Sequence, residues 1–177
     1  MTGSFRGEFS QKVDGKGRVS IPAAFRRHLE DGDPEFRARR EALRGEDDKV
    51  KGGARFVIVY GDARREFLEC YTVEGMAALE ARILAIPRGT PRRRALERVF
   101  ITLSTVAEID GDGRIVLPQK LREKLALGEE AVFAGTADTF QIWQPEAYDR
   151  DLAEKAGEEI EGLAPGVDIA ALLDRDV

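Results

Sequence analysis

Residues 14–29 read DGKGRVSIPAAFRRHL, and residues 110–125 read DGDGRIVLPQKLREKL. The two stretches lie 96 positions apart and match without a gap at seven of their sixteen positions. The identities are the Asp-Gly-x-Gly-Arg motif, one proline, one arginine and one leucine. Self-similarity of this kind is the signature of a structural unit that occurs more than once. The sequence therefore predicts one small unit, used twice in a chain of 177 residues.

Each unit has the pattern of a strand, a tight turn, a second strand and a short helix. In the Asp-Gly-x-Gly turn, glycine supplies the positive φ that a sharp reversal needs. Pro22 and Pro118 suit the first position of a helix, because proline has a fixed φ and its missing N–H has no intrahelical use there. Apolar side chains follow at i, i+4 spacing. The strands are predicted at residues 11–13, 18–21, 106–109 and 114–117.

The rest of the chain is arranged around these two units. Two further strands are expected to complete each unit, and apolar periodicity predicts connecting helices between the units. Residues 31–53 are highly charged and have no counterpart in the second unit, so we expect a mobile loop with one marginal helix. The predicted organisation is a first module (1–73), connecting helices (74–104), a second module (105–148) and an acidic extension (149–177).

Charge is distributed unevenly along the chain. The net charge is −5, but residues 1–30 carry six basic against three acidic side chains, whereas residues 145–177 carry three basic against ten acidic ones. A basic front suits an anionic partner even in an acidic protein. The one cysteine, Cys70, cannot form an internal disulfide, and no apolar run approaches the ~20 residues that span a bilayer. A cytoplasmic protein without a membrane segment is therefore expected.

Residues with catalytic chemistry are sparse in this sequence. The one histidine, His28, falls on a short predicted helix, where a lone imidazole is more often a boundary residue than a catalyst. Residues 110–113 resemble the start of a calcium loop, but its fifth and twelfth positions hold Arg114 and Leu121 instead of oxygen ligands. No catalytic residue, metal site or cofactor is predicted.

The strongest functional signal is charge at fixed places on the repeat. Five basic positions surround the hairpin tip and the helix start of the first unit, and three of their counterparts in the second unit are acidic. Lysine and arginine neutralise phosphates, and a guanidinium can also read guanine edges. The sequence thus predicts that the first unit binds nucleic acid. The paired positions are Lys12/Glu108, Lys16/Asp112, Arg18/Arg114, Arg26/Arg122 and Arg27/Glu123.

Other interpretations of these charges stay open. A charged hairpin is often a solvated sheet edge. In each turn an arginine follows an aspartate by four residues, so the pair could brace the hairpin, and one arginine can serve both roles. A separate basic cluster, Arg92-Arg93-Arg94 with Arg98, opens a predicted helix, where cations oppose the helix dipole. The favoured partner of that cluster is an acidic face of a neighbouring subunit, and phosphate is the alternative.

The tandem Asp-x-x-x-Arg pattern resembles that of the MraZ family of bacterial transcriptional regulators. The supporting segments are residues 5–7, 14–22, 91–104 and 110–118. Each unit is similar to the SpoVT/AbrB module of transition-state regulators and some antitoxins. The resemblance implies an α+β fold in which two tandem swapped-hairpin modules form a pseudo-twofold β-barrel core, with helices between and after them.

The resemblance also implies a function and a set of site residues. A homo-oligomeric ring would present its hairpins to double-stranded DNA, at direct repeats in the promoter of the division and cell-wall gene cluster. Sequence-specific repression at the nucleoid is expected, and an antitoxin-like scaffold that holds a partner protein is the alternative. The predicted DNA contacts are Arg6, Lys12, Lys16, Arg18, Arg26 and Arg27, and the predicted turn-bracing residues are Asp14, Asp110 and Arg114.

Overall fold

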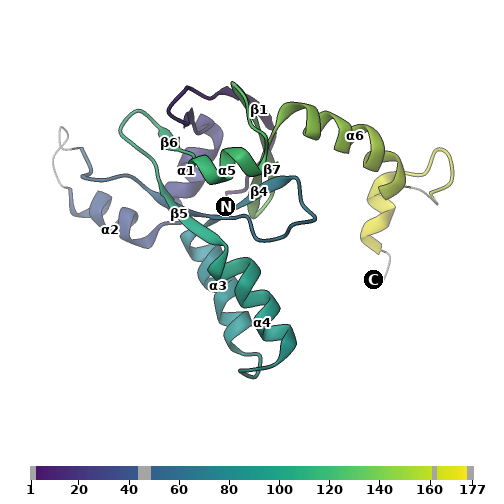
Figure 1. The fold of residues 1–177 in the computed structure, drawn as a ribbon, viewed down its shortest axis with the longest axis horizontal. Helices are drawn as coiled ribbons and strands as arrows, with labels where there is room; N and C mark the ends of the chain where they lie inside the picture. The colour runs from purple at the N-terminus through teal and green to yellow at the C-terminus, as the bar shows by residue number, and fades with distance from the viewer. Residues whose placement is uncertain (1–2, 44–48, 161–162, 175–177) are drawn as a thin grey trace. The chain divides into compact units, whose positions relative to one another are not determined.

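Both units have the same order of elements, and their strands lie within a few residues of the predicted places (Figure 1). The computed structural model describes residues 3–43, 49–160 and 163–174. The first unit contains β1 (Glu8–Lys12), β2 (Arg18–Ser20), α1 (Ala23–Asp31), β3 (Arg55–Val59) and β4 (Phe67–Thr72). The second unit contains β5 (Ser104–Glu108), β6 (Arg114–Val116), α5 (Gln119–Lys124), β7 (Glu130–Thr136) and β8 (Thr139–Trp143).

The main sheet interleaves strands of the two units. Its six strands run in the order β1-β7-β8-β4-β3-β5, and every neighbouring pair is antiparallel. The first strand of each unit therefore pairs with the closing strands of the other unit. The short strands β2 and β6 pair with each other in a separate two-stranded ribbon. This exchange explains why both units fall within one compact body, residues 1–144, while residues 145–177 form a second.

The expected mixed α+β fold with an antiparallel sheet is confirmed, but the expected barrel is not found. The six-stranded sheet is open, with β1 and β5 as its edges. The ribbon of β2 and β6 does not join these edges into a closed barrel within the described parts of the chain, because each of its strands is only three residues long and pairs with the other.

An aromatic cluster drawn from both units forms the centre of the core. The ring of Phe140 lies 5.0 Å from that of Phe5, 5.1 Å from Phe25 and 5.6 Å from Phe56, measured between centroids. All four side chains are fully buried. Tilted and edge-on rings at these separations stabilise a core beyond the area that they bury. Because the cluster draws on both units, neither unit has a complete core of its own.

The insertion, residues 31–53, is more ordered at its start than the sequence predicts. It contains α2 (Pro34–Ala42), which begins after Asp33. The fully buried Asp33 carboxylate accepts the N–H groups of Glu35 at 3.1 Å and Phe36 at 3.2 Å, and also the N–H of Arg55 at 2.9 Å. The helix is thus capped and tied to β3. The high charge of the segment indicated a mobile loop, so the sequence did not predict this anchor. The rest of the expected loop includes residues 44–48, which lie outside the described residues.

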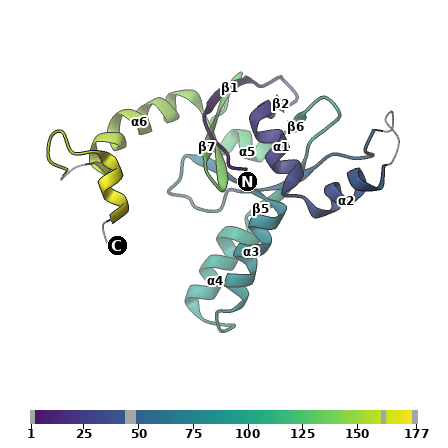
Figure 2. The same cartoon turned by 180° about the vertical axis from the view of Figure 1, so that it is seen from behind.

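Two connecting helices lie side by side as a hairpin that projects from the sheet (Figures 1 and 2). They are α3 (Val73–Leu84) and α4 (Pro91–Glu97), and a π-helical turn, Arg98–Thr102, leads on to β5. Arg93 is buried between them, since its Nε binds Glu97 at 2.7 Å and its Nη1 donates to the carbonyl oxygen of Ile86 at 2.8 Å. One cation of the predicted cluster is therefore satisfied within its own chain.

The second compact body starts with α6 (Pro145–Glu159) and includes a 3-10 segment, Ile169–Asp174. Among the described residues, no helix is both long enough and apolar enough to cross a bilayer.

Candidate nucleic-acid interface

The turn of the first hairpin is organised by Asp14. Its carboxylate accepts the backbone N–H groups of Lys16 and Arg18, both at 2.9 Å, and the Nε–H of Arg18 at 2.6 Å. These donors hold the pKa of Asp14 below its ordinary value, and the backbone N–H of Arg18 is the main cause. The Arg18 side chain remains 41% exposed, so the same guanidinium can bind a second anion.

The turn of the second hairpin repeats this arrangement with one difference. Asp110 accepts the N–H groups of Asp112 at 2.8 Å and Arg114 at 2.9 Å, and the second of these bonds is the main cause of its lowered pKa. The Arg114 guanidinium lies 3.6 Å from Asp110, but its closest contact is Asp112, at 2.9 Å. Asp112 stands where the first hairpin has Lys16, so the second hairpin places a further carboxylate beside its own arginine, although the buried Arg114 Nε has no hydrogen-bond partner among the described residues.

Each hairpin turn is also covered by an arginine from the other unit. Arg122, on α5, lies against Gly17, where an added Cβ would come within 2.8 Å of Arg122 Nε. Its Nε donates to the carbonyl oxygen of Leu117 at 3.1 Å. Arg26, on α1, covers Gly113 in the equivalent way, and an added Cβ there would lie 2.8 Å from Arg26 Cζ. The two arginines that both units retain at the helix therefore brace the partner unit's turn.

This packing changes the interpretation of Arg26. Its Nε is buried and has no hydrogen-bond partner among the described residues. A guanidinium in that position is a structural contact first, and its remaining donors decide whether it reaches a ligand. The charge of Arg26 and its position on the predicted helix led to its prediction as a DNA contact. Its packing against Gly113 could not be predicted, because the two residues are far apart in the chain.

A polar groove of about 700 Å³ lies beside the ribbon of β2 and β6. It brings Lys12 and Arg18 of the first unit next to Arg114 and Arg122 of the second. The acidic side chains in its lining are Asp14, Glu129 and Glu130. The groove therefore combines cations from both units, a juxtaposition that the repeat pattern did not predict.

Lys12 has a partner of opposite charge across the sheet. It lies directly opposite Glu130 in the pairing of β1 with β7. The equivalent pair, in β5 and β3, is Glu108 opposite Arg55, with the two charges exchanged. Opposite charges at facing positions of an antiparallel pair stabilise it. The charge change between Lys12 and Glu108 thus has a structural explanation beside the functional one.

The remaining predicted contacts fall into two places. Lys16, at the first turn, and Arg27, on α1, are exposed and have no ion pair with the described residues. Arg6 is also exposed, but it precedes β1 and so lies roughly 20 Å along the chain from Lys12, at the far end of the strand. Of the six predicted contacts, Lys12, Lys16 and Arg27 are exposed cations on the hairpin or its helix.

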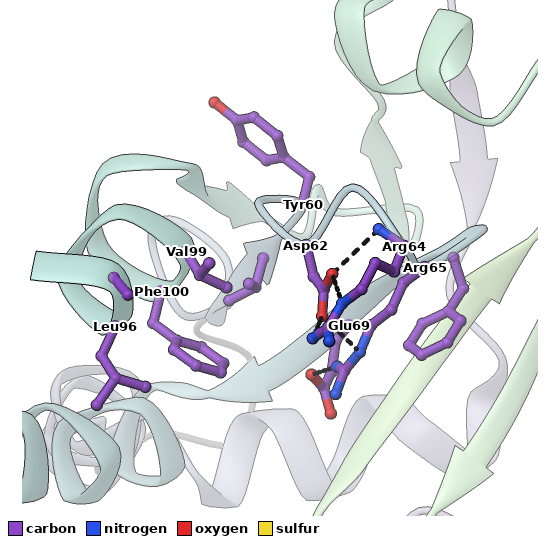
Figure 3. A pocket seen from close by; sticks show the side chains of 11 residues that line it. Tyr60, Asp62, Arg64, Arg65, Glu69, Leu96, Val99 and Phe100 are labelled. Carbon is purple, nitrogen blue, oxygen red and sulfur yellow. Dashed lines mark hydrogen bonds and ion pairs between the residues drawn. The ribbon is translucent and has the colours of Figure 1, made fainter. Parts of the chain in front are cut away.

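A second pocket, of about 290 Å³, lies between residues 60–67 and the start of the π-helical turn (Figure 3). Figure 3 shows the apolar side chains of Leu96, Val99 and Phe100 on one side and charged side chains on the other. Those charges pair locally, since Arg64 binds Asp62 at 2.8 Å and Arg65 binds Glu69 at 2.5 Å. This pocket offers no free cation to a polyanion among its lining residues.

Cys70 and His28, the side chains of this chain best suited to catalysis, both lie in packed surroundings. Cys70 is fully buried, and burial raises the pKa of its thiol. His28 packs edge-on against Phe5, with ring centroids 4.5 Å apart. No group of three or more His, Cys, Asp or Glu side chains that could hold a metal ion occurs in the described parts of the chain.

The fold and the site define a class of α+β protein built from two similar units. The hairpin turn of the first unit carries the basic Lys16, and that of the second unit carries the acidic Asp112 at the equivalent position. A family model described as "MraZ protein, putative antitoxin-like" matches residues 4–43 and 100–162. The chain belongs to the MraZ family, as its sequence pattern predicted.

Curated relatives support this assignment along the whole length of the chain. The chain is 50% identical to the transcriptional regulator MraZ of Cereibacter sphaeroides, over 98% of both chains. It is 47% identical to that of Ruegeria pomeroyi, over 98% of this chain and 97% of the relative. A more distant relative with the same name, from Desulfitobacterium hafniense, is 34% identical over 78% and 80% of the two chains.

Proposed function

We propose that this protein is a sequence-specific DNA-binding transcriptional regulator that acts without catalysis. The shared name of its relatives supports a role in transcription. The observation that carries DNA binding is the exposed cation pair Lys16 and Arg27, on a hairpin and helix whose counterparts hold Asp112 and Glu123. Because the two units share one fold but carry opposite charges at these positions, we infer that they differ in function.

In this proposal the first hairpin and α1 approach the DNA together. Lys16 and Arg27 bind phosphates, and Lys12 with Arg18 extends the contact into the groove. Phosphate contacts set affinity and position, whereas an arginine that reaches a base edge supplies sequence information. Arg6 adds a contact at the far end of β1, and the packed position of Arg26 favours bracing over direct contact.

The proposed assembly is a ring of identical chains at the nucleoid, in the cytoplasm. The interleaved strands support an intramolecular version of the swapped-hairpin module, since each unit's first strand pairs in the other unit. Several weak hairpins on one ring would bind phased direct repeats through effective concentration. Occupancy of repeats upstream of division and cell-wall genes would exclude polymerase and repress them.

The test compares two equivalent arginines on DNA from upstream of the protein's own gene. Arg18→Ala should weaken binding at least about tenfold, because a charged hydrogen-bonding contact is worth roughly 1.5–3 kcal/mol. Arg114→Ala should act on stability instead, because two carboxylates of its own turn, Asp110 and Asp112, lie beside the Arg114 guanidinium, whereas Arg18 has only Asp14. Gel-shift titration and native mass measurement read out both effects. Equal losses of binding in two well-folded variants would refute the assignment of DNA contact to the first unit.

A second candidate function is an antitoxin-like scaffold. The family description includes the words "antitoxin-like", and the acidic second body exposes apolar side chains such as Leu173, which is 87% exposed. Deletion of residues 145–177 would then abolish co-purification of a partner and leave DNA binding intact. If the same deletion instead abolished DNA binding, the result would favour the transcriptional regulator over the scaffold.

A further inference from the structure

The two-stranded ribbon of β2 and β6 has one face in the core and one face toward solvent. Val19 and Ile115 lie opposite each other in the pairing, and both are buried. Because side chains alternate along a strand, the residues on either side of this pair lie on the outer face. Both units therefore contribute to one accessible surface. Its members are Arg18 and Ser20 of β2, with Arg114 and Val116 of β6.

Val116 differs from the other side chains on this face, because it is apolar and yet 59% exposed. In the register of the ribbon it lies directly opposite Arg18. The Cβ atoms of facing residues in an antiparallel pair are about 5 Å apart. An uncovered apolar side chain therefore lies beside the arginine to which we assign a DNA contact.

We propose that Val116 reads the methyl group of a thymine in the major groove, beside a guanine that Arg18 contacts. This inference rests on the proposed DNA-binding function, and it gives the second unit a part in sequence recognition. The major groove admits a two-stranded β-ribbon, and it is the groove that displays the thymine methyl. Arginine binds the O6 and N7 acceptors of guanine there, whereas an apolar side chain contacts the methyl group.

The charge around this face favours DNA over a protein partner. The groove beside the ribbon is lined by four cations, Lys12, Arg18, Arg114 and Arg122, and by three carboxylates. Within β2 and β6, all of whose residues the structure describes, Val116 is the only exposed large apolar side chain. A protein interface needs a broader apolar centre. A single apolar side chain among cations instead matches a base edge that lies between phosphate backbones.

The register of the ribbon limits how far apart the two contacted bases can lie. Successive base pairs are about 3.4 Å apart along the duplex. Two side chains about 5 Å apart therefore reach bases within about two steps of each other. The inference predicts a thymine at that separation from the guanine in each repeat that a hairpin binds.

Replacement of thymine by uracil tests the contact, because it removes only the methyl group. The full-length protein is titrated in gel shifts against DNA from upstream of its own gene, with one thymine position at a time changed to uracil in every repeat. Loss of one buried methyl contact should weaken binding about fourfold at a single position. Substitution of guanines by an analogue without the N7 acceptor locates the Arg18 contact in the same way.

Variants of the protein connect the uracil effect to Val116. In Val116→Ser the sensitive position should no longer distinguish thymine from uracil, whereas Val116→Thr, which keeps a methyl group, should retain the discrimination. Val106→Ser is the matched control, because Val106 is a valine of the same unit that is 63% exposed on β5. This control should discriminate as the wild type does.

Three results would overturn the inference. Equal affinity for all the uracil-substituted DNAs would exclude a methyl contact. A uracil effect that persists in Val116→Ser would arise from the shape of the DNA, and an effect farther than about two or three steps from the guanine would contradict the register. With any of these results, salt-dependent binding would leave the proposed function intact. Wild-type protein that binds none of this DNA would refute that function and this inference together.

Discussion

At the scale of single residues, the internal repeat allows each position of the first unit to be compared with its counterpart in the second. The arginines that both units retain make intramolecular contacts, since Arg18 binds Asp14 and Arg122 covers Gly17. The cations that only the first unit has, such as Lys16 and Arg27, point to solvent. The retained arginines therefore have contacts within the chain, to which our proposal adds a DNA contact for Arg18, and the divergent positions carry the charge difference between the two units.

Lys16 provides the cleanest test of that distinction. Lys16→Asp gives the first turn the sequence of the second, so the fold should be unaffected while a phosphate contact is lost. We expect an unchanged thermal midpoint and weaker binding to all DNA sequences. The slope of log affinity against log salt should become shallower by about one. The reverse change, Asp112→Lys, is the control and should leave operator binding unchanged or strengthen it. A Lys16→Asp variant that binds DNA with the wild-type salt slope would contradict the prediction.

Asp33 connects the charge of one side chain to the stability of the insertion. Burial alone would raise its pKa, but hydrogen bonds, chiefly from the backbone N–H of Arg55, outweigh burial and lower it. Its contribution to stability is therefore complete above 3.8, the ordinary pKa of aspartate, and is lost as the pH falls through the lowered folded value.

Replacement of this carboxylate should remove both the cap and the pH dependence. Asp33→Ala should lower the free energy of unfolding at pH 7 by about 1–3 kcal/mol, because it removes the cap of α2 and leaves buried N–H groups unpaired. Urea unfolding at pH 7 and at pH 3 measures the effect. The difference between wild type and variant should shrink at the lower pH; a difference that grows there would exclude the assignment.

At the scale of elements, the first hairpin turn requires glycine at one of its two glycine positions and not at the other. Gly17 has a φ of +79°, and a Cβ there would lie 2.6 Å from the carbonyl oxygen of Leu117. Gly15 meets nothing within 4 Å and its φ lies outside the left-handed region. The close approach at Gly17 is what allows α5 of the other unit to cover the turn.

Alanine should therefore be destabilising at Gly17 and tolerated at Gly15. Gly17→Ala should lower the thermal midpoint by about 2–8 °C, because a left-handed alanine costs about 1–2 kcal/mol in a chain of this size. It should also weaken DNA binding by displacing the turn. Gly15→Ala, two residues earlier in the same turn, is the control and should leave both properties near wild type. Equal midpoints for the two variants would show that the turn is not held by this contact.

At the scale of the whole molecule, the net charge of −5 has to be reconciled with the polyanionic partner that we propose. The chain separates its charges, with a basic front in the first unit and an acidic second body. In the proposed assembly, local cations would bind DNA while the remaining surface repels it. Each hairpin would then contribute a modest affinity, and the repetition of hairpins would supply the rest.

This arrangement predicts steep sensitivity to ionic strength. Each phosphate that a lysine or arginine neutralises adds about 0.9 to the slope of log affinity against log salt on duplex DNA. Gel-shift titration between low and physiological salt should show a linear decline that becomes steeper with the number of operator repeats. Affinity that stays constant over this range would rule out phosphate contact as the basis of binding.

The sequence by itself determined the duplicated unit, its strands, turns and helices, and its family, because glycine turns, proline starts and apolar spacing are local properties. It also predicted which positions differ in charge between the units. Only the tertiary structure decided which strands of the two units pair, that Arg26 and Arg122 each cover the hairpin turn of the other unit, and that Lys12 faces Glu130. These contacts join residues that are far apart in the chain, and no local pattern specifies which distant partner will pack against a given side chain.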